Sequence, residues 1–292
     1  MLDLPGMRLT ERDKAILSSV SRYRFLTTSH ILSLVPGSRQ NLVRRLQRLY
    51  HAGFLDRPRG QLPLRYAREL FEFVYSPTRQ TLSQGVAKSI ETDSWGKCRA
   101  VSSLFLAHAL AVSDALIRFE ADCRLHGLSF IAETDIIAAL PVTQARRFAW
   151  RVMIRGGAET ESIGVVPDAA FAVEHTGHSA TPRRWHFFLE LDRGTMPLHR
   201  KSLRQSSIHR KVLAYSRTRI SRALKDSYGI SGFQVIFIAR SEERLKHIRE
   251  TCDAATKGRA SFLFLFATQE ELRLRNHLIA SAITGNDSRG LG

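Results

Sequence analysis

The stretch that decides the fold is residues 184–195, RWHFFLELDRGT, in which a run of bulky apolar residues ends in Glu190 and Asp192. Side chains alternate between the two faces of a β-strand, so His186, Phe188, Glu190 and Asp192 share one face. The other face takes Trp185, Phe187, Leu189 and Leu191. Because acids seldom finish a strand that feeds a core, this strand end is a candidate functional site.

A second acid comes just before the neighbouring apolar segment. Residues 165–173 read VVPDAAFAV, and Pro167 loosens the strand ladder directly before Asp168. If this segment pairs with the first strand, Asp168 comes close to Glu190. Carboxylates on adjacent strand ends suit Mg²⁺ or Mn²⁺, which polarise phosphate and activate water. We therefore expect a divalent metal site built from Asp168, Glu190 and Asp192, with Glu133, near the end of an earlier strand, as a further acid.

The surrounding sequence predicts an α/β domain over residues 98–282. Strands alternate with helices there, which indicates a mixed sheet flanked by helices. Residues 100–127 predict one long helix, and residues 196–224 predict another after the acidic strand. QVIFIA and FLFLFA are uniformly apolar, as central parallel strands are. Residues 283–292 are expected to form a disordered tail.

Residues 1–90 predict a separate winged helix-turn-helix domain, mostly helical with a β-hairpin wing. Thr10 and Asp13 form the start of a first helix, close to a capping box. A second helix begins near Thr28 and ends at a Pro-Gly break, and Ser38 is a natural N-cap for a third. Residues 54–78 read as two strands around a basic loop. In such domains the third helix enters the DNA major groove.

The net charge of +17 is concentrated in two segments. Residues 1–90 hold 15 Lys and Arg against 6 Asp and Glu, and residues 183–222 hold 11 against 2. Clustered positive charge indicates a polyphosphate partner, although solubility or an acidic protein partner remain alternatives. We expect double-stranded DNA as the partner. The expected DNA contacts are Arg39, Gln40, Arg44, Arg45, Arg48, Arg57 and Arg59 in the first segment, and Arg183, Arg184, Arg193, Lys201 and Arg204 in the second.

The order helix, strand, PD, hairpin, E-x-acid and helix resembles the PD-(D/E)xK superfamily of restriction-endonuclease-like nucleases. More narrowly, HALAVSDAL, PDAAFAV, FFLELDRGT and KVLAY, following a winged helix, resemble the replication-relaxation family of plasmids and other mobile elements. This resemblance covers nearly the whole chain. It implies that Asp168 and Glu190 bind the metal, and that a lysine two residues after the glutamate orients the attacking water.

The sequence departs from the nuclease pattern at Asp192, which stands where the resemblance places the lysine. Lys211 from the following helix is the best substitute, with Lys201 behind it. On one continuous helix Lys201, Arg204, Ile208, Lys211 and Tyr215 would form a stripe, so Lys211 could face the sheet; equally, Lys211 could only touch phosphate. His108 and Asp114 stand where the family shows His and Asp, and the apolar neighbours of His108 favour a core role over a catalytic one.

Two functions stay open. The first is a DNA-binding protein of a mobile element that hydrolyses or nicks DNA with Mg²⁺ or Mn²⁺ during replication, mobilisation or transfer. The second is a non-catalytic regulator or relaxosome accessory factor with a degenerate nuclease fold. A relaxase or replication protein as partner, or a homodimer, fits either function. The absence of His-x-His, GxSxG and glycine-rich phosphate-loop motifs argues against a tyrosine relaxase, a serine hydrolase and ATP use.

The sequence also indicates the cellular compartment in which the protein is expected. No apolar run approaches the roughly 18 residues that span a bilayer, and residues 1–14 lack a secretory signal. We therefore expect a cytoplasmic protein without membrane association. The scattered Cys98, Cys123 and Cys252 are expected to be reduced thiols.

Overall fold

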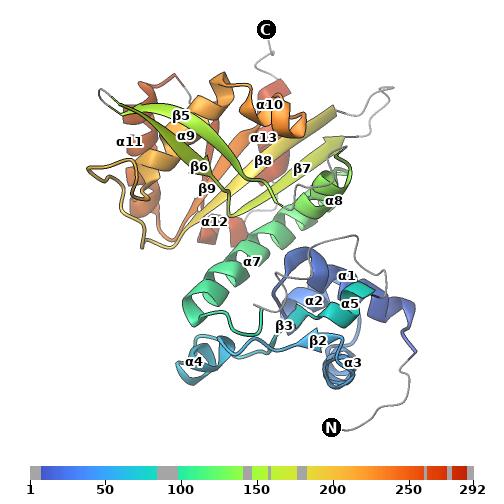
Figure 1. Ribbon diagram of the computed structural model, residues 1–292. Coiled ribbons are helices and arrows are strands. Elements are labelled where there is room, and N and C mark those ends of the chain that lie inside the picture. The colour runs from blue at the N-terminus through green and yellow to red at the C-terminus, as the bar shows by residue number, and fades with distance from the viewer. Residues whose placement is uncertain are drawn as a thin grey trace. The chain divides into compact units, whose positions relative to one another are not determined.

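The computed structural model describes residues 8–83, 98–140, 147–156, 159–175, 183–259, 262–274 and 278–287 (Figure 1). The chain divides into two compact units, Met1–Ile117 and Arg118–Gly292. Their border falls within helix α7 (Ser103–Leu125), so the first part of α7 belongs to the N-terminal unit. Helices and both antiparallel and parallel strands confirm the expected α/β class.

The N-terminal unit is mainly helical. Its elements before α7 are α1 (Glu11–Tyr23), β1 (Leu26–Thr27), α2 (Thr28–Leu34), α3 (Arg39–His51), β2 (Leu55–Asp56), α4 (Gln61–Tyr66), β3 (Val74–Pro77) and α5 (Arg79–Ser83). Thr10 and Asp13 complete a capping box at α1, and the Ser38 side chain caps α3, as expected. Leu17, Leu42 and Leu46 are fully buried between the helices, and β3 lies between β1 and β2 in an antiparallel sheet.

The predicted wing differs from a simple hairpin. Strands β2 and β3 do pair antiparallel, but the short helix α4 stands between them where a basic loop was expected. The buried Gln61 side chain donates to the Pro58 carbonyl and accepts from the Val74 amide, both at 3.0 Å, which ties α4 to β3. A Cβ at Gly60 would collide with the Val101 carbonyl oxygen, so the close approach there requires glycine.

The C-terminal unit is built around a five-stranded sheet in the order β10-β9-β8-β7-β4. Its strands β4, β7 and β8 are antiparallel, whereas β8, β9 and β10 are parallel. The elements after α7 are β4 (Ser129–Ala132), α8 (Glu133–Ala138), β5 (Trp150–Gly156), β6 (Glu159–Val165), β7 (Ala169–His175), β8 (Arg183–Asp192), α9 (Ile208–Ile220), α10 (Ala223–Tyr228), β9 (Gln234–Ala239), α11 (Glu242–Thr256), β10 (Phe264–Thr268), α12 (Gln269–Leu274) and α13 (Leu278–Asp287).

Several elements of this unit differ from the sequence-based expectation. QVIFIA and the segment around β10 are parallel strands, but only β9 is central, because β10 is the last strand of the sheet. The apolar segment around Pro167 is interrupted: β6 pairs with β5 in a separate two-stranded sheet, and β7 begins at Ala169. Helix α13 extends into the predicted disordered tail and buries Ile283, while residues 288–292 lie outside the described part of the chain.

The predicted helix over residues 196–224 begins only at Ile208. Ser207 is its N-cap, and the amides of Ile208 and His209 donate to the carbonyls of Pro197 and Leu198 at 3.1 and 2.9 Å. Residues 193–207, here called the basic loop, therefore fold back onto the start of α9 without forming a helix. Lys201 and Arg204 belong to this loop, so the prediction that they share one helical stripe with Lys211 is wrong.

The two faces of β8 have different surroundings, as the alternation of its side chains predicts. Phe188 packs with Trp150 of β5 and Tyr215 of α9, and the β5–β6 hairpin lies against α9 (Figure 1). On the other face, Phe187 stacks on Phe171 of β7, with ring centroids 5.1 Å apart. The three cysteines are buried. No described helix is long and apolar enough to cross a membrane.

Candidate functional site

Asp168 lies directly before β7, beside the end of β8 that carries Glu190. Its amide donates to the Leu189 carbonyl at 3.1 Å, and its Oδ2 accepts from the Leu191 amide at 2.8 Å. These two bonds place Asp168 beside the residues that flank Glu190, and its negative charge adds to the rise that burial causes in the pKa of Glu190. The structure therefore brings together the two acids that the sequence singles out.

Glu190 is a buried carboxylate, with 2% of its surface exposed. Its Oε2 accepts from the Lys211 ammonium, and its Oε1 accepts from the Tyr215 hydroxyl at 2.5 Å. Burial raises the pKa of Glu190 to about 7; the charge of Lys211 opposes this rise and that of Asp168 adds to it. A carboxyl group with this pKa changes its charge near neutral pH.

Lys211 is the cation of this cluster. Burial acts to lower its pKa, but the neighbouring acids, first Glu190 and then Asp168, outweigh burial and raise the pKa above its usual value. Lys211 therefore stays protonated beside both carboxylates. Its position follows from the start of α9, where the Ser207 side chain accepts from the Arg210 amide at 3.1 Å.

Tyr215 completes the cluster and was not among the predicted site residues. It is four residues after Lys211, so the two side chains lie on the same side of α9. Its ring is fully buried, and burial raises the pKa of its hydroxyl well above 10, which keeps it a hydrogen-bond donor to Glu190. The spacing of KVLAY was the signal that could have identified it.

Asp192 has a different set of partners. Arg244 of α11 donates to its Oδ2 at 2.6 Å and to its Oδ1 at 3.4 Å, and the Gly194 amide donates to its Oδ2 at 3.2 Å. Arg244 also donates to the Met196 carbonyl. Asp192 thus anchors the beginning of the basic loop to α11. Nothing in the local sequence marks Arg244 as its partner.

Glu133, the first residue of α8, contacts backbone groups. Its two carboxylate oxygens accept from the Phe148 amide at 2.9 Å and the Ala170 amide at 3.2 Å. Burial raises the pKa of Glu133, and these amides together with Arg147 oppose that rise. These contacts hold the start of β7 beside the chain that enters β5, which gives Glu133 a structural role.

The carboxylates near the end of β8 can be compared with the ligands that a metal ion requires. In the described parts of the chain, no group of three or more His, Cys, Asp or Glu residues could hold an ion. Mg²⁺ often takes only one or two carboxylates and completes its shell with water and substrate phosphate. Asp168 and Glu190 fit that chemistry as a pair, without Asp192 or Glu133.

The predicted DNA contacts of the second segment are distributed over β8 and the basic loop. Arg184 pairs with Glu174 at 2.7 Å, and Arg204 lies 3.7 Å from Glu161. The Arg183 guanidinium lies over the Trp185 ring. Lys201 is exposed and Arg193 is half-buried.

The predicted DNA contacts of α3 separate into free and engaged side chains. Gln40, Arg44 and Arg48 are exposed along the helix. Arg45, in contrast, pairs through two nitrogens with Asp13, whose surface is 0% exposed, and so stabilises the fold. Arg39, the first residue of α3, pairs with Glu72. Beyond α3, the Arg57 guanidinium lies over aromatic rings, and Arg59 is exposed.

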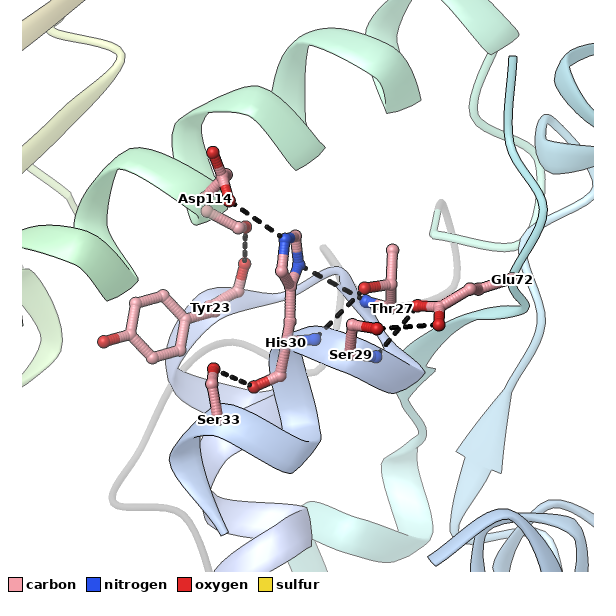
Figure 2. A network of polar contacts seen from close by, with 8 residues as sticks. Tyr23, Thr27, Ser29, His30, Ser33, Glu72 and Asp114 are labelled. Atoms are coloured by element: carbon pink, nitrogen blue, oxygen red, sulfur yellow. Dashed lines mark hydrogen bonds and ion pairs between the residues drawn. The ribbon is translucent and has the colours of Figure 1, made fainter. Parts of the chain in front are cut away.

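Figure 2 shows a polar network around His30 of α2. The Thr27 amide donates to His30 Nδ1 at 3.4 Å, and His30 Nε2 lies 3.6 Å from Asp114 of α7. The Ser113 hydroxyl donates to the Tyr23 carbonyl at 3.3 Å. Asp114 therefore contributes to the packing of α7 within the N-terminal unit. His108, on the same helix, is half-buried.

The sequence matches a known protein family. A family model described as replication-relaxation matches residues 17–232. No curated protein and no solved structure matches the chain.

Proposed function

The chain belongs to the replication-relaxation family, whose model covers most of its length, and from this premise we propose that it is a DNA-binding protein with a metal-dependent nuclease centre. Family membership associates the chain with the replication or relaxation of plasmids and other mobile elements. The finer proposal is that the C-terminal unit hydrolyses a phosphodiester bond and the N-terminal unit binds duplex DNA.

The observation that carries the nuclease proposal is the cluster of Asp168, Glu190 and Lys211. Two carboxylates and a charged lysine are the residue types that the PD-(D/E)xK resemblance requires, and Lys211 supplies the ammonium that Asp192 cannot. Burial and the charge of Asp168 raise the pKa of Glu190, and raised carboxyl pKa values are common at functional sites. Lys211 would hold a negatively charged oxygen near the carboxylates, and Tyr215 would fix the orientation of Glu190.

Asp168 and Glu190 are the residues that would hold Mg²⁺ or Mn²⁺. When bound, such an ion polarises phosphate and activates water. A cation would also offset the charge of two adjacent acids, one of which is buried. Asp192 has no part in this proposal, because its carboxylate is paired with Arg244.

The test is cleavage of supercoiled plasmid DNA with Mg²⁺ or Mn²⁺. Asp168→Ala should abolish cleavage, because it removes a metal ligand. Glu174→Gln is a suitable control, since Glu174 lies near the other end of β7 and pairs with Arg184. Failure of the wild-type protein to cut any DNA form with either metal would exclude the nuclease proposal.

A second function, a non-catalytic DNA-binding regulator or accessory factor, is favoured by one observation. Both oxygens of Glu190 already accept from protein donors, Lys211 and Tyr215. Calorimetric titration with Mn²⁺ separates the two functions. Metal binding lost in Asp168→Ala favours the nuclease, whereas no binding by the wild-type protein favours the accessory factor. Binding to a relaxase or a replication protein stays a prediction, as does the formation of a homodimer.

The DNA-binding part of the proposal rests on the exposed face of α3. Gln40, Arg44 and Arg48 are available there to phosphates or bases. Arg44→Ala/Arg48→Ala should weaken duplex binding and lower the slope of log affinity against log salt by about 2. Lys225→Ala/Lys246→Ala removes two exposed charges from the C-terminal unit and is the matched control. Equal losses in both variants would contradict a specific role for α3.

A further inference from the structure

An unusual surface lies on α4 and the turn that leads from it to β3. Tyr66 is 85% exposed and Phe71 is 81% exposed. Both are aromatic side chains that a folded protein usually covers. They lie at the same turn, because the Arg65 guanidinium, next to Tyr66 in sequence, donates to the Phe71 carbonyl at 3.3 Å. The segment between α4 and β3 therefore carries two large rings that are exposed to water.

Two arginines of the same segment lie over other aromatic rings, those of Phe73 and Tyr50. The guanidinium carbons of Arg57 and Arg65 lie 4.0 and 4.3 Å from the centroid of the Phe73 ring, and Arg57 also lies 4.4 Å from that of Tyr50. Such contacts hold flat cationic groups in place. Arg57, Arg65, Tyr66, Phe71 and Phe73 are here called the arginine–aromatic surface.

The charge of this segment indicates the kind of partner. Residues 57–73 contain four arginines and two glutamates. One of the glutamates, Glu72, is already paired with Arg39 and accepts from Ser29. The surface is thus positive as well as aromatic. A strand of nucleic acid with unpaired bases offers both complementary groups, since bases stack on aromatic rings and phosphates pair with arginine.

We propose that the arginine–aromatic surface binds single-stranded DNA by stacking unpaired bases on Tyr66 and Phe71. This inference rests on the proposed DNA-binding function and adds to it a second class of substrate. The exposed face of α3 takes duplex DNA, and the arginine–aromatic surface takes the unpaired strand of an opened or forked region. The helix that replaces a plain basic wing serves to present the rings.

The experiment measures fluorescence anisotropy of a labelled oligothymidine of about 20 nucleotides and of a duplex of the same length. Full-length protein is used in EDTA, so that no cleavage occurs. Tyr66→Ala/Phe71→Ala should weaken oligothymidine binding by about tenfold for each ring removed and leave duplex binding within about twofold. Tyr66→Phe/Phe71→Tyr keeps both rings and should bind like the wild-type protein. Because both side chains are exposed, neither change disturbs the core.

Several results would overturn the inference. They are unchanged oligothymidine binding in the alanine variant, or equal loss of oligothymidine and duplex binding. A third result is that the wild-type protein is a dimer, whereas the alanine variant is a monomer that still binds oligothymidine. That result would make this surface a contact between copies. Wild-type protein that binds only duplex DNA also refutes it but leaves the proposed function standing. Wild-type protein that binds neither DNA refutes the DNA-binding proposal itself.

Discussion

Arg244 of α11 donates to both carboxylate oxygens of Asp192, at 2.6 and 3.4 Å, and its guanidinium also donates to the Met196 carbonyl. This pair gives a structural role to Asp192, the acid at the position where the PD-(D/E)xK resemblance places a lysine. The carboxylate at the end of β8 anchors the first residues of the basic loop, and the loop then folds onto the start of α9. Lys211 is carried on that helix, so Asp192 affects the site through the chain that positions Lys211.

The first prediction concerns this pair. Arg244→Met should lower the free energy of unfolding by about 3 kcal/mol, because it leaves the buried Asp192 carboxylate without its cation. Arg184→Met, which removes a cation from the more exposed pair with Glu174, should cost less than about 1 kcal/mol. Urea unfolding measures both. Asp192→Asn combined with Arg244→Met should cost less than the two separate changes added together; strict additivity would argue against the pair.

The second prediction is a pH dependence of stability in the metal-free protein. The pKa of Glu190 is raised from 4.5 to about 7 by burial, so the folded protein binds a proton here that the unfolded chain has already released. The stability that Glu190 contributes is complete below about pH 4.5 and falls as the pH rises to about 7. The loss is on the order of 3 kcal/mol.

Glu190→Gln isolates this effect, because a glutamine does not titrate. The free energy of unfolding of the wild-type protein should fall more steeply between pH 5 and pH 7 than that of the variant. Comparing slopes is necessary, since the variant also leaves Lys211 without its carboxylate partner. Parallel curves in EDTA would show that Glu190 is ionised across the whole range.

The third prediction concerns Lys211. Lys211→Met should reduce plasmid cleavage by about 100-fold or more, the usual cost of removing one charge-stabilising donor. Lys225→Met, an exposed lysine on α10, should leave cleavage unchanged.

Metal binding gives a readout for Lys211 that does not depend on cleavage. The Lys211 charge acts to lower the pKa of Glu190, so its removal should raise that pKa further. Since a carboxylate binds metal in its deprotonated form, Mn²⁺ binding by Lys211→Met should need a higher pH than binding by the wild-type protein. The same pH dependence in both proteins would place Lys211 outside the site.

The sequence correctly predicted those features that depend on residues close together in the chain or on adjacent strands. The caps at Thr10 and Ser38 follow from side chains that accept from nearby amides, and the meeting of Asp168 with Glu190 follows from strand pairing. The start of α9 could not be predicted in this way. Residues 196–207 have helical composition, but Pro197 and Leu198 use their carbonyls for the amides of Ile208 and His209.

Ion pairs between residues that are distant in sequence were the other feature that could not be predicted. Arg244 is 52 residues from Asp192, and Arg45 is 32 residues from Asp13. An arginine that is exposed on a helix and an arginine that pairs with a buried acid look alike in the sequence, because their spacing along the helix is similar. Periodicity therefore predicted Arg45 as a DNA contact together with Arg44 and Arg48, whereas the fold uses it as the counter-ion of Asp13.

The last prediction separates these arginines. Arg45→Met should lower the free energy of unfolding by about 3 kcal/mol, because the Asp13 carboxylate is buried and loses a two-nitrogen pairing. Arg44→Met removes an exposed charge from the same helix and should change stability by less than about 0.5 kcal/mol. Duplex binding, measured well below both unfolding transitions, should weaken in Arg44→Met more than in Arg45→Met. The opposite order for binding would mean that Arg45 leaves Asp13 to contact DNA, and equal stabilities would refute its structural role.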